Sequence, residues 1–174
     1  MRRWVTGDAE ALARAVAESA EHLRPWMEWI ATEPPPIEPR REMLGAWERE
    51  WAQGGDAIYG VFVDDQVAGG GGLHRRIAPD GLEIGYWIHS AWLRQGLATR
   101  VAKLLTDAAF TLPGITHVEI HHDKANRASA GVPRKLGFEW LGEVEDEPLA
   151  PAELGLESRW RMDRRRWRRP GGGS

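Results

Sequence analysis

One stretch, residues 85–138, restricts the fold of this 174-residue chain more than any other. It begins as a short strand, passes through the small, flexible loop of residues 94–99 and continues from Leu97 as an amphipathic helix. A strand at residues 118–121 and a further helix follow. Alternating strands and helices predict an α/β protein. Where the loop enters the helix, unpaired backbone N–H groups meet the positive end of the helix dipole, which predicts an anion site suited to phosphate.

Two other phosphate-binding loops do not fit this sequence. A P-loop needs Gly-Lys-Ser/Thr after its turn, whereas Gly96 is followed by Leu97 and Ala98. A dinucleotide-binding loop needs three glycines at fixed spacing, and the loop at residues 94–99 has one. The loop therefore belongs to neither class.

The loop resembles the acyl-CoA pyrophosphate loop of the GNAT superfamily of N-acetyltransferases, whose pattern is Gln/Arg-x-x-Gly-x-Gly/Ala. Gly96 and Ala98 match the last two positions, whereas Leu93 stands where Gln or Arg is usual. Such a loop binds phosphate mainly through its main chain. The resemblance implies acetyl-CoA as the co-substrate and the following cofactor-binding residues: Ile88, His89, Arg94, Gln95, Gly96, Leu97, Ala98, Thr99, Asn126 and Ser129.

The next residues resemble the RimJ/RimL-like branch, which acetylates protein N-termini. Residues 126–129 read Asn-Arg-Ala-Ser and residues 134–138 read Arg-Lys-Leu-Gly-Phe, similar to that branch's Asn-x-x-Ser and Lys-Leu-Gly-Phe. Residues 23–29 and the Gly-Tyr-Trp of residues 85–87 look like the same branch. The resemblance implies a mixed, mostly antiparallel central sheet with helices on both faces. It also implies a splay between the fourth and fifth strands, through which the pantetheine enters.

Length and composition predict a single domain over residues 1–169, followed by a flexible tail or cloning remnant at residues 170–174. The chain lacks an apolar run of 18 residues and an opening signal segment, so we expect a cytoplasmic protein that neither spans a membrane nor is exported. Without cysteine there is no thiol nucleophile. We therefore expect direct acyl transfer in a ternary complex.

The charge distribution indicates a cationic acceptor. Five of the 23 basic side chains lie after Asp163, together with none of the 26 acidic ones, so the rest of the chain is acidic. An acidic surface attracts an amine and repels nucleic acid. We interpret the terminal arginines as a solvated end. The sequence leaves a monomer and a homodimer equally open.

Periodicity and turn residues predict the remaining elements. We expect strands at residues 3–5, 57–63, 66–76, 82–89, 138–144 and 156–162, and helices at residues 8–22 and 40–53. In the helix after Gly96 the predicted buried stripe is Leu97, Val101, Leu104, Ala108 and Leu112. The glycines of residues 69–72 lead into Leu73 and His74 and not into a helix, which predicts a flexible or bulged strand and not a second phosphate loop. Pro133 predicts a helix that begins late, with proline in its first turn.

The histidines do not predict a metal site. In a strand, His117 and His121 lie about 13 Å apart at ~3.3 Å per residue, and His122 points to the other face. The helical His-Glu-x-x-His motif is missing too. We expect no metal.

Acyl transfer to an amine needs a base. Glu83 is our first candidate, because its position matches the family strand that lines the active cleft, and Glu119 is the second. Glu145 or Glu147 could reach in from a late loop. An α-amine with a pKa near 8 is already roughly one-tenth neutral at pH 7, whereas a lysine side chain at ~10.4 is almost entirely protonated. An α-amine acceptor therefore depends less on a strong base than a lysine acceptor does.

The leaving thiolate needs a proton. Many members of the superfamily supply it from a tyrosine, but that position is Pro133 here, so the resemblance passes the role to Ser129, with Asn126 on the pantetheine arm. Trp26, Trp29 and Trp87 are the predicted acceptor-binding residues. The alternative for Trp26 and Trp29 is packing in the core.

Three other functions stay open at this point. The acceptor could be a small-molecule amine, or the donor a larger acyl-CoA such as succinyl-CoA. An arginine at the acyl end of the pocket would favour a carboxylated acyl group. A non-catalytic acyl-CoA-binding regulator is the alternative of another class, motivated by Pro133 and Leu93.

Overall fold

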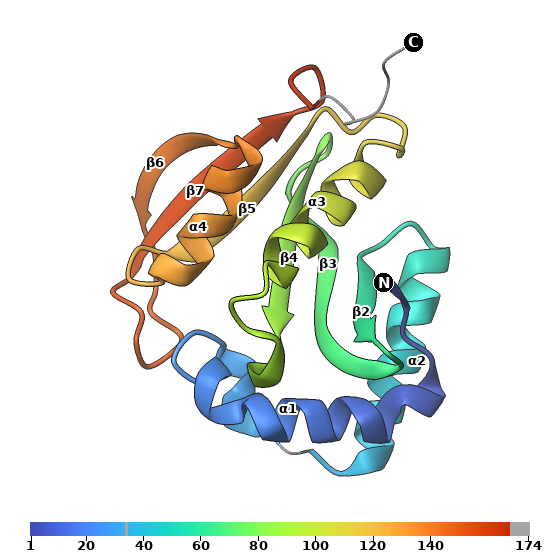
Figure 1. Cartoon of the computed structure of the whole chain (residues 1–174). Helices are drawn as coiled ribbons and strands as arrows, with labels where there is room; N and C mark the ends of the chain where they lie inside the picture. The colour runs from blue at the N-terminus through green and yellow to red at the C-terminus, as the bar shows by residue number, and fades with distance from the viewer. Residues whose placement is uncertain (34, 168–174) are drawn as a thin grey trace.

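The computed structural model describes residues 1–33 and 35–167, which are built around one seven-stranded sheet (Figure 1). The strands are β1 (Arg2–Arg3), β2 (Ala57–Val63), β3 (Gln66–Ala78), β4 (Gly81–Ile88), β5 (His117–Asp123), β6 (Glu139–Glu145) and β7 (Leu156–Asp163). The helices are α1 (Ala9–Leu23), α2 (Ile37–Ala52), α3 (Leu97–Ala109) and α4 (Arg127–Leu136), with 3-10 turns η1 (Thr6–Asp8), η2 (Glu28–Thr32) and η3 (Ser90–Trp92).

The sheet opens between its fourth and fifth strands. Its order is β1-β2-β3-β4-β5-β7-β6, and every pairing is antiparallel except β4 with β5. That parallel pairing ends where Glu83 lies opposite Glu119, whereas β4 stays paired with β3 as far as Ile88. The two strands therefore separate beyond Glu83. The predicted fold class, with its splay, is confirmed.

Helices cover both faces of the sheet, and each face has its own core. Ala57 and Val61 of β2 belong to the core under α3, whereas their neighbours Ile58 and Phe62 pack with α1 and α2. Successive side chains of a strand point to opposite faces, so one strand supplies both cores. Burial of apolar side chains on both sides, at roughly 25 cal/mol per Å², holds the layers together.

Gly71 of β3 lets α3 lie directly on the sheet. A Cβ at this position would come within 3.1 Å of Leu105 Cδ1 and of Val101 Cγ1. The pairing of β2 with β3 also shifts by one residue between Val61 and Phe62. Residues 69–72 therefore form part of a bulged strand, as predicted.

Two predictions about helices were wrong. Leu104 is 50% exposed, because the buried face of α3 is turned toward Val101, Leu105 and Ala109. Pro133 lies inside α4, which already begins at Arg127. Proline there removes the N–H that would bond the carbonyl of Ser129 one turn earlier. That carbonyl instead lies 3.5 Å from the hydroxyl of Tyr86.

Smaller differences concern the ends of elements. The first strand covers Arg2–Arg3 in place of residues 3–5, and α2 begins at Ile37, three residues before the predicted start. The predicted tail, residues 170–174, lies outside the described residues, and the single domain of residues 1–169 stays a prediction. No helix in the described part of the chain has the length and apolarity to cross a membrane.

Candidate active site

The loop between β4 and α3 ends in an open helix N-terminus. Gly96 is the N-cap of α3 with a φ of 75°, and no side chain caps the helix. The backbone N–H groups of the first turn, at Leu97, Ala98 and Thr99, have no carbonyl one turn earlier within the helix. This geometry suits a pyrophosphate.

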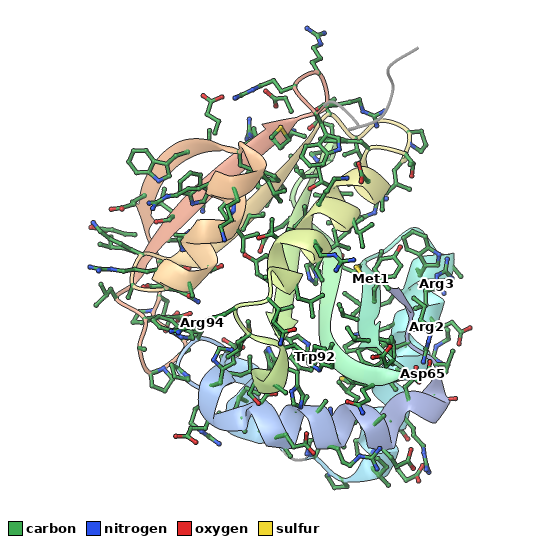
Figure 2. All side chains as sticks on the ribbon, viewed as in Figure 1. Met1, Arg2, Arg3, Asp65, Trp92 and Arg94 are labelled. Carbon is green, nitrogen blue, oxygen red and sulfur yellow. The ribbon has the colours of Figure 1, made fainter. Side chains whose placement is uncertain are left out.

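Side chains of the same loop support its shape. His89, which is buried, accepts from the N–H of Ala91 through Nδ1, while its Nε2 lies 3.0 Å from Glu18. Gln95 Nε2 donates to the carbonyl of Ala91 at 3.2 Å. Arg94 is exposed on the loop that leads into α3, as Figure 2 shows. Among these predicted cofactor residues, His89 and Gln95 therefore order the loop, and Arg94 faces solvent.

A cleft of about 870 Å³, called the central cleft below, has residues of β3, β4 and α2 in its walls. Its walls include all three predicted acceptor residues, Trp26, Trp29 and Trp87, and the rings of Trp29 and Trp87 meet edge to face with centroids 6.3 Å apart. Tyr86 and Ser129 also line the central cleft. The cleft therefore connects the tryptophans with the opening between β4 and β5.

Tyr86 and Ser129 form a hydroxyl pair that the sequence did not reveal. The phenol oxygen lies 3.1 Å from Ser129 Oγ, although 43 positions separate the two residues. Burial raises the pKa of Tyr86 to about 12 against a smaller lowering by its hydrogen bond to Ser129, so the phenol is neutral at pH 7. Gly-Tyr-Trp was interpreted only as a branch feature, and no spacing rule links β4 to α4.

The edge of β4 at the opening presents backbone donors. The N–H of His89 bonds the carbonyl of Ala68 in β3 at 3.0 Å. Because successive N–H groups of a strand alternate in direction, those of Tyr86 and Ile88 point toward β5. Pairing with β5 has ended at Glu83. A carbonyl placed in the opening can therefore accept from the N–H of Ile88.

Glu83, the first candidate base, lines the central cleft but is held by an arginine. Its two carboxylate oxygens accept from Arg76 at 2.8 and 2.5 Å, and one of them lies 3.6 Å from His121 Nδ1. The side chain is buried in this pair. Both carboxylate oxygens are therefore engaged by Nε and Nη2 of one arginine, in a bidentate pair.

Glu119, the second candidate, is more tightly held. Burial would raise its pKa, but hydrogen bonds from His121 and Arg161 outweigh burial and lower the pKa to about 2. Glu119 is absent from the described walls of the central cleft, whereas Glu147 lines it and Glu145 is exposed at the end of β6. This placement favours Glu83 over Glu119.

Asn126 positions Ser129. Its side-chain oxygen accepts the N–H of Ser129 at 3.1 Å and thereby caps α4. Both residues line the central cleft. In the described part of the chain, no group of three His, Asp or Glu side chains is arranged to hold a metal ion.

Known proteins resemble this chain in sequence and in fold. Residues 1–139 match the acetyltransferase (GNAT) domain. The "Putative ribosomal N-acetyltransferase YdaF" of Bacillus subtilis (strain 168) is 28% identical over 141 residues, which cover 80% of this chain and 76% of YdaF. A structure described as a probable acetyltransferase, 26% identical, superposes with a TM-score of 0.86 over 95% of this chain and 93% of its own.

Two further structures share the fold. RimL, an alpha-N-protein acetyltransferase of a ribosomal protein, in complex with coenzyme A, has a TM-score of 0.84 at 19% identity, covering 93% of this chain and 92% of RimL. Mycobacterium smegmatis RimJ, in complex with a CoA-disulfide, has a TM-score of 0.82 at 20% identity, covering 94% of this chain and 81% of RimJ. The chain therefore belongs to the GNAT acetyltransferase family, is an N-acetyltransferase that uses acetyl-CoA, and shares its fold with the RimJ/RimL-like branch.

Proposed function

We propose that this enzyme acetylates the N-terminal α-amine of a protein by direct transfer from acetyl-CoA in a ternary complex. The observation that carries the proposal is the central cleft, which reaches the hydroxyl pair of Tyr86 and Ser129 at the opening in the sheet. Its walls include rigid aromatic rings and carboxylates, which suit a flexible cationic chain end. YdaF and RimL, by their names, act on ribosomal proteins, which supports a protein acceptor met in the cytoplasm.

In the proposed mechanism the N–H of Ile88 donates to the thioester carbonyl and stabilises the negative charge that develops on its oxygen. The amine nitrogen forms a bond to the acyl carbon and loses a proton to a base, for which Glu83 is the candidate from the sequence. The carbon–sulfur bond breaks, and Ser129 donates its hydroxyl proton to the sulfur. Tyr86 then replaces the proton of Ser129 across the 3.1 Å contact and regains its own proton from solvent. Pro133 stands where many members of the superfamily have the donor tyrosine. In this proposal Ser129 and Tyr86 supply the proton in its place.

The cleft argues for an acetyl group over a carboxylated acyl group. Arg40 and Arg76 line the central cleft, but Arg40 pairs with Glu33 and Arg76 with Glu83. Both cationic charges are thus already neutralised by carboxylates. A succinyl group would have to compete with Glu83 for both bonding nitrogens of Arg76 and with Glu33 for the charge of Arg40, although Nε of Arg40 has no partner in the described structure, so acetyl-CoA is the favoured donor.

Thiol release from acetyl-CoA tests the proposal, with short peptides bearing free N-termini and with small primary amines as acceptors. We expect peptide-dependent release and a kcat about tenfold or more lower in Ser129→Ala, because the sulfur loses its proton donor. Tyr86→Phe should lower kcat by less than Ser129→Ala does, since water can reprotonate Ser129. Binding of acetyl-CoA should be unchanged in both variants.

The chain offers a matched control, because it has two tyrosines. Tyr59 packs against Trp51, away from the central cleft, so Tyr59→Phe should leave kcat unaltered. Release with small amines but not with peptides would overturn the protein acceptor. Full activity in Ser129→Ala would overturn the role of the serine.

A further inference from the structure

An aspartate–histidine pair lies on the acceptor side of the central cleft. His74 Nδ1, on β3, lies 2.7 Å from Oδ2 of Asp56, the residue before β2. The other oxygen of Asp56 accepts the backbone N–H of Arg75 at 2.8 Å. Both Asp56 and His74 line the central cleft. The pair plays no part in the mechanism described so far.

The hydrogen bond to Asp56 selects the tautomer of His74. A carboxylate can only accept, so Nδ1 carries the hydrogen and, in the neutral ring, Nε2 carries the lone pair. Burial would raise the pKa of Asp56, but the hydrogen bonds from Arg75 and His74 lower it, which keeps the carboxylate ionised. The ring is therefore oriented with a proton acceptor at its free nitrogen.

Two glycines place that nitrogen over the sheet. His74 Nε2 would lie 3.0 Å from a Cβ at Gly72 and 3.1 Å from a Cβ at Gly85, so any larger residue would displace the ring. Gly72 lies opposite Gly85 across the β3–β4 pairing, and both line the central cleft. The ring nitrogen thus lies against β4 one residue before Tyr86, next to the opening.

The two sides of β4 then carry opposite functions. His74 and Trp87 lie on the face covered by α1 and α2, whereas Tyr86 points to the face of α3 and α4, where it meets Ser129. A thioester in the opening would thus have a proton acceptor on the side from which the amine enters. It would have a hydroxyl donor on the side to which the sulfur leaves.

We propose that His74 Nε2 is the general base that accepts the proton of the acceptor amine, and that Asp56 is its positioning residue. The ammonium form of the amine transfers one proton to Nε2, the neutral nitrogen attacks the acyl carbon, and the imidazolium is stabilised by Asp56. The nitrogen releases its second proton to solvent as the carbon–sulfur bond breaks and the sulfur takes the proton of Ser129. Glu83 is the competing candidate, but Arg76 occupies both of its oxygens. The proposal rests on amine acetylation, which the family shows, and not on the proposed protein acceptor.

The pH dependence of kcat/KM tests this assignment. In His74→Gln we expect a loss of at least tenfold at pH 7 that shrinks toward pH 9, where the free α-amine of a peptide has already lost its proton. The charged groups around His74 are Asp56, Arg76 and Glu83, with Glu50 of α2 in the same cleft. Glu83→Gln therefore runs in parallel as the competing variant and should keep the pH profile of the parent.

Further measurements distinguish a catalytic role of His74 from a structural one. Thermal unfolding and acetyl-CoA binding must match the parent, and added imidazole should restore activity to His74→Ala. Asp56→Asn should shift the nitrogen NMR signals of His74 away from the Nδ1–H tautomer. An unchanged pH profile in His74→Gln, or a profile flattened by Glu83→Gln instead, would overturn the proposal. If only small amines are acetylated, the proposal of a protein acceptor is wrong. The pH dependence of kcat/KM, measured with the amine that reacts, still tests the role of His74.

Discussion

Thr99→Glu is expected to weaken acetyl-CoA binding about 100-fold, which corresponds to ~2.7 kcal/mol, without destabilising the chain. Thr99 lies in the first turn of α3, next to the N–H groups that we assign to the pyrophosphate. A carboxylate at this position repels the phosphates and accepts the same backbone hydrogen bonds. It also complements the helix dipole, which is worth ~0.3–1 kcal/mol in favour of folding. The variant should therefore lose affinity and keep or gain stability.

Thr99→Gln is the matched control, since it has the size of glutamate without the charge. Titration calorimetry should find a Kd for acetyl-CoA within a few-fold of the parent for glutamine, and the 100-fold loss for glutamate should decrease as salt screens the repulsion. Urea unfolding measures the stability of all three proteins. Equal affinities for the Glu and Gln variants would show that the phosphates bind elsewhere.

The sequence predicted the order of the elements and the loop that leads into α3 because both depend on local chemistry. Gly96 is the N-cap of α3, and the strand predicted at residues 57–63 has those bounds in the structure. Leu104 shows where local reasoning ends. Two neighbouring stripes of α3 are both apolar, and only the contact of Val101 and Leu105 with Gly71 selects the buried one.

Several predicted site residues, among them Glu83, Trp87 and Ser129, line the central cleft, but their pairings did not follow from the sequence. Ser129 meets Tyr86, and His74 meets Asp56, across 43 and 18 positions respectively. Which side chains of two strands share a face depends on register, and register is set by bulges such as the one in β3. The sequence therefore supplied Ser129 as a donor but not its partner.

The carboxylates were the least predictable part of the site. Glu83 and Glu119 look alike in the sequence, as alternate residues of strands. In the structure both are buried and both bind arginine. Whether a buried glutamate acts as a base or as a counter-ion is decided by such distant partners, as when hydrogen bonds from His121 and Arg161 lower the pKa of Glu119. His121, which lies among them, shows the same effect with the opposite sign.

His121→Gln is expected to lower the free energy of unfolding by on the order of 3 kcal/mol at pH 6.5 and by far less at pH 10. His121 Nε2 lies 2.6 Å from Glu119, while Nδ1 lies 3.5 Å from Glu157 and 3.6 Å from Glu83. Burial would lower the pKa of His121, but the hydrogen bonds with Glu119 and Glu157 outweigh burial and raise the pKa to about 9. The imidazolium therefore offsets the repulsion among two buried carboxylates, Glu83 and Glu119, and the partly buried Glu157.

The sign of the pH dependence follows from the direction of that shift. A pKa raised from 6.5 to about 9 contributes stability that is complete below pH 6.5 and is lost as the pH rises through 9. Glu119 and Glu157, each with a pKa lowered to about 2, stay ionised throughout this window. Arg76, Arg159 and Arg161 pair with the three carboxylates.

Urea unfolding between pH 6.5 and 10 should therefore find the parent losing stability with rising pH, while His121→Gln changes little and meets the parent near pH 10. His22→Gln is the control. His22 lies on α1, remote from this cluster, and burial lowers its pKa, so this variant should follow the parent curve over the same range. Parallel curves for the parent and His121→Gln would mean that the imidazole is neutral among the three glutamates. The ionic account of this cluster would then fail, because one of the carboxylates would have to carry the proton instead.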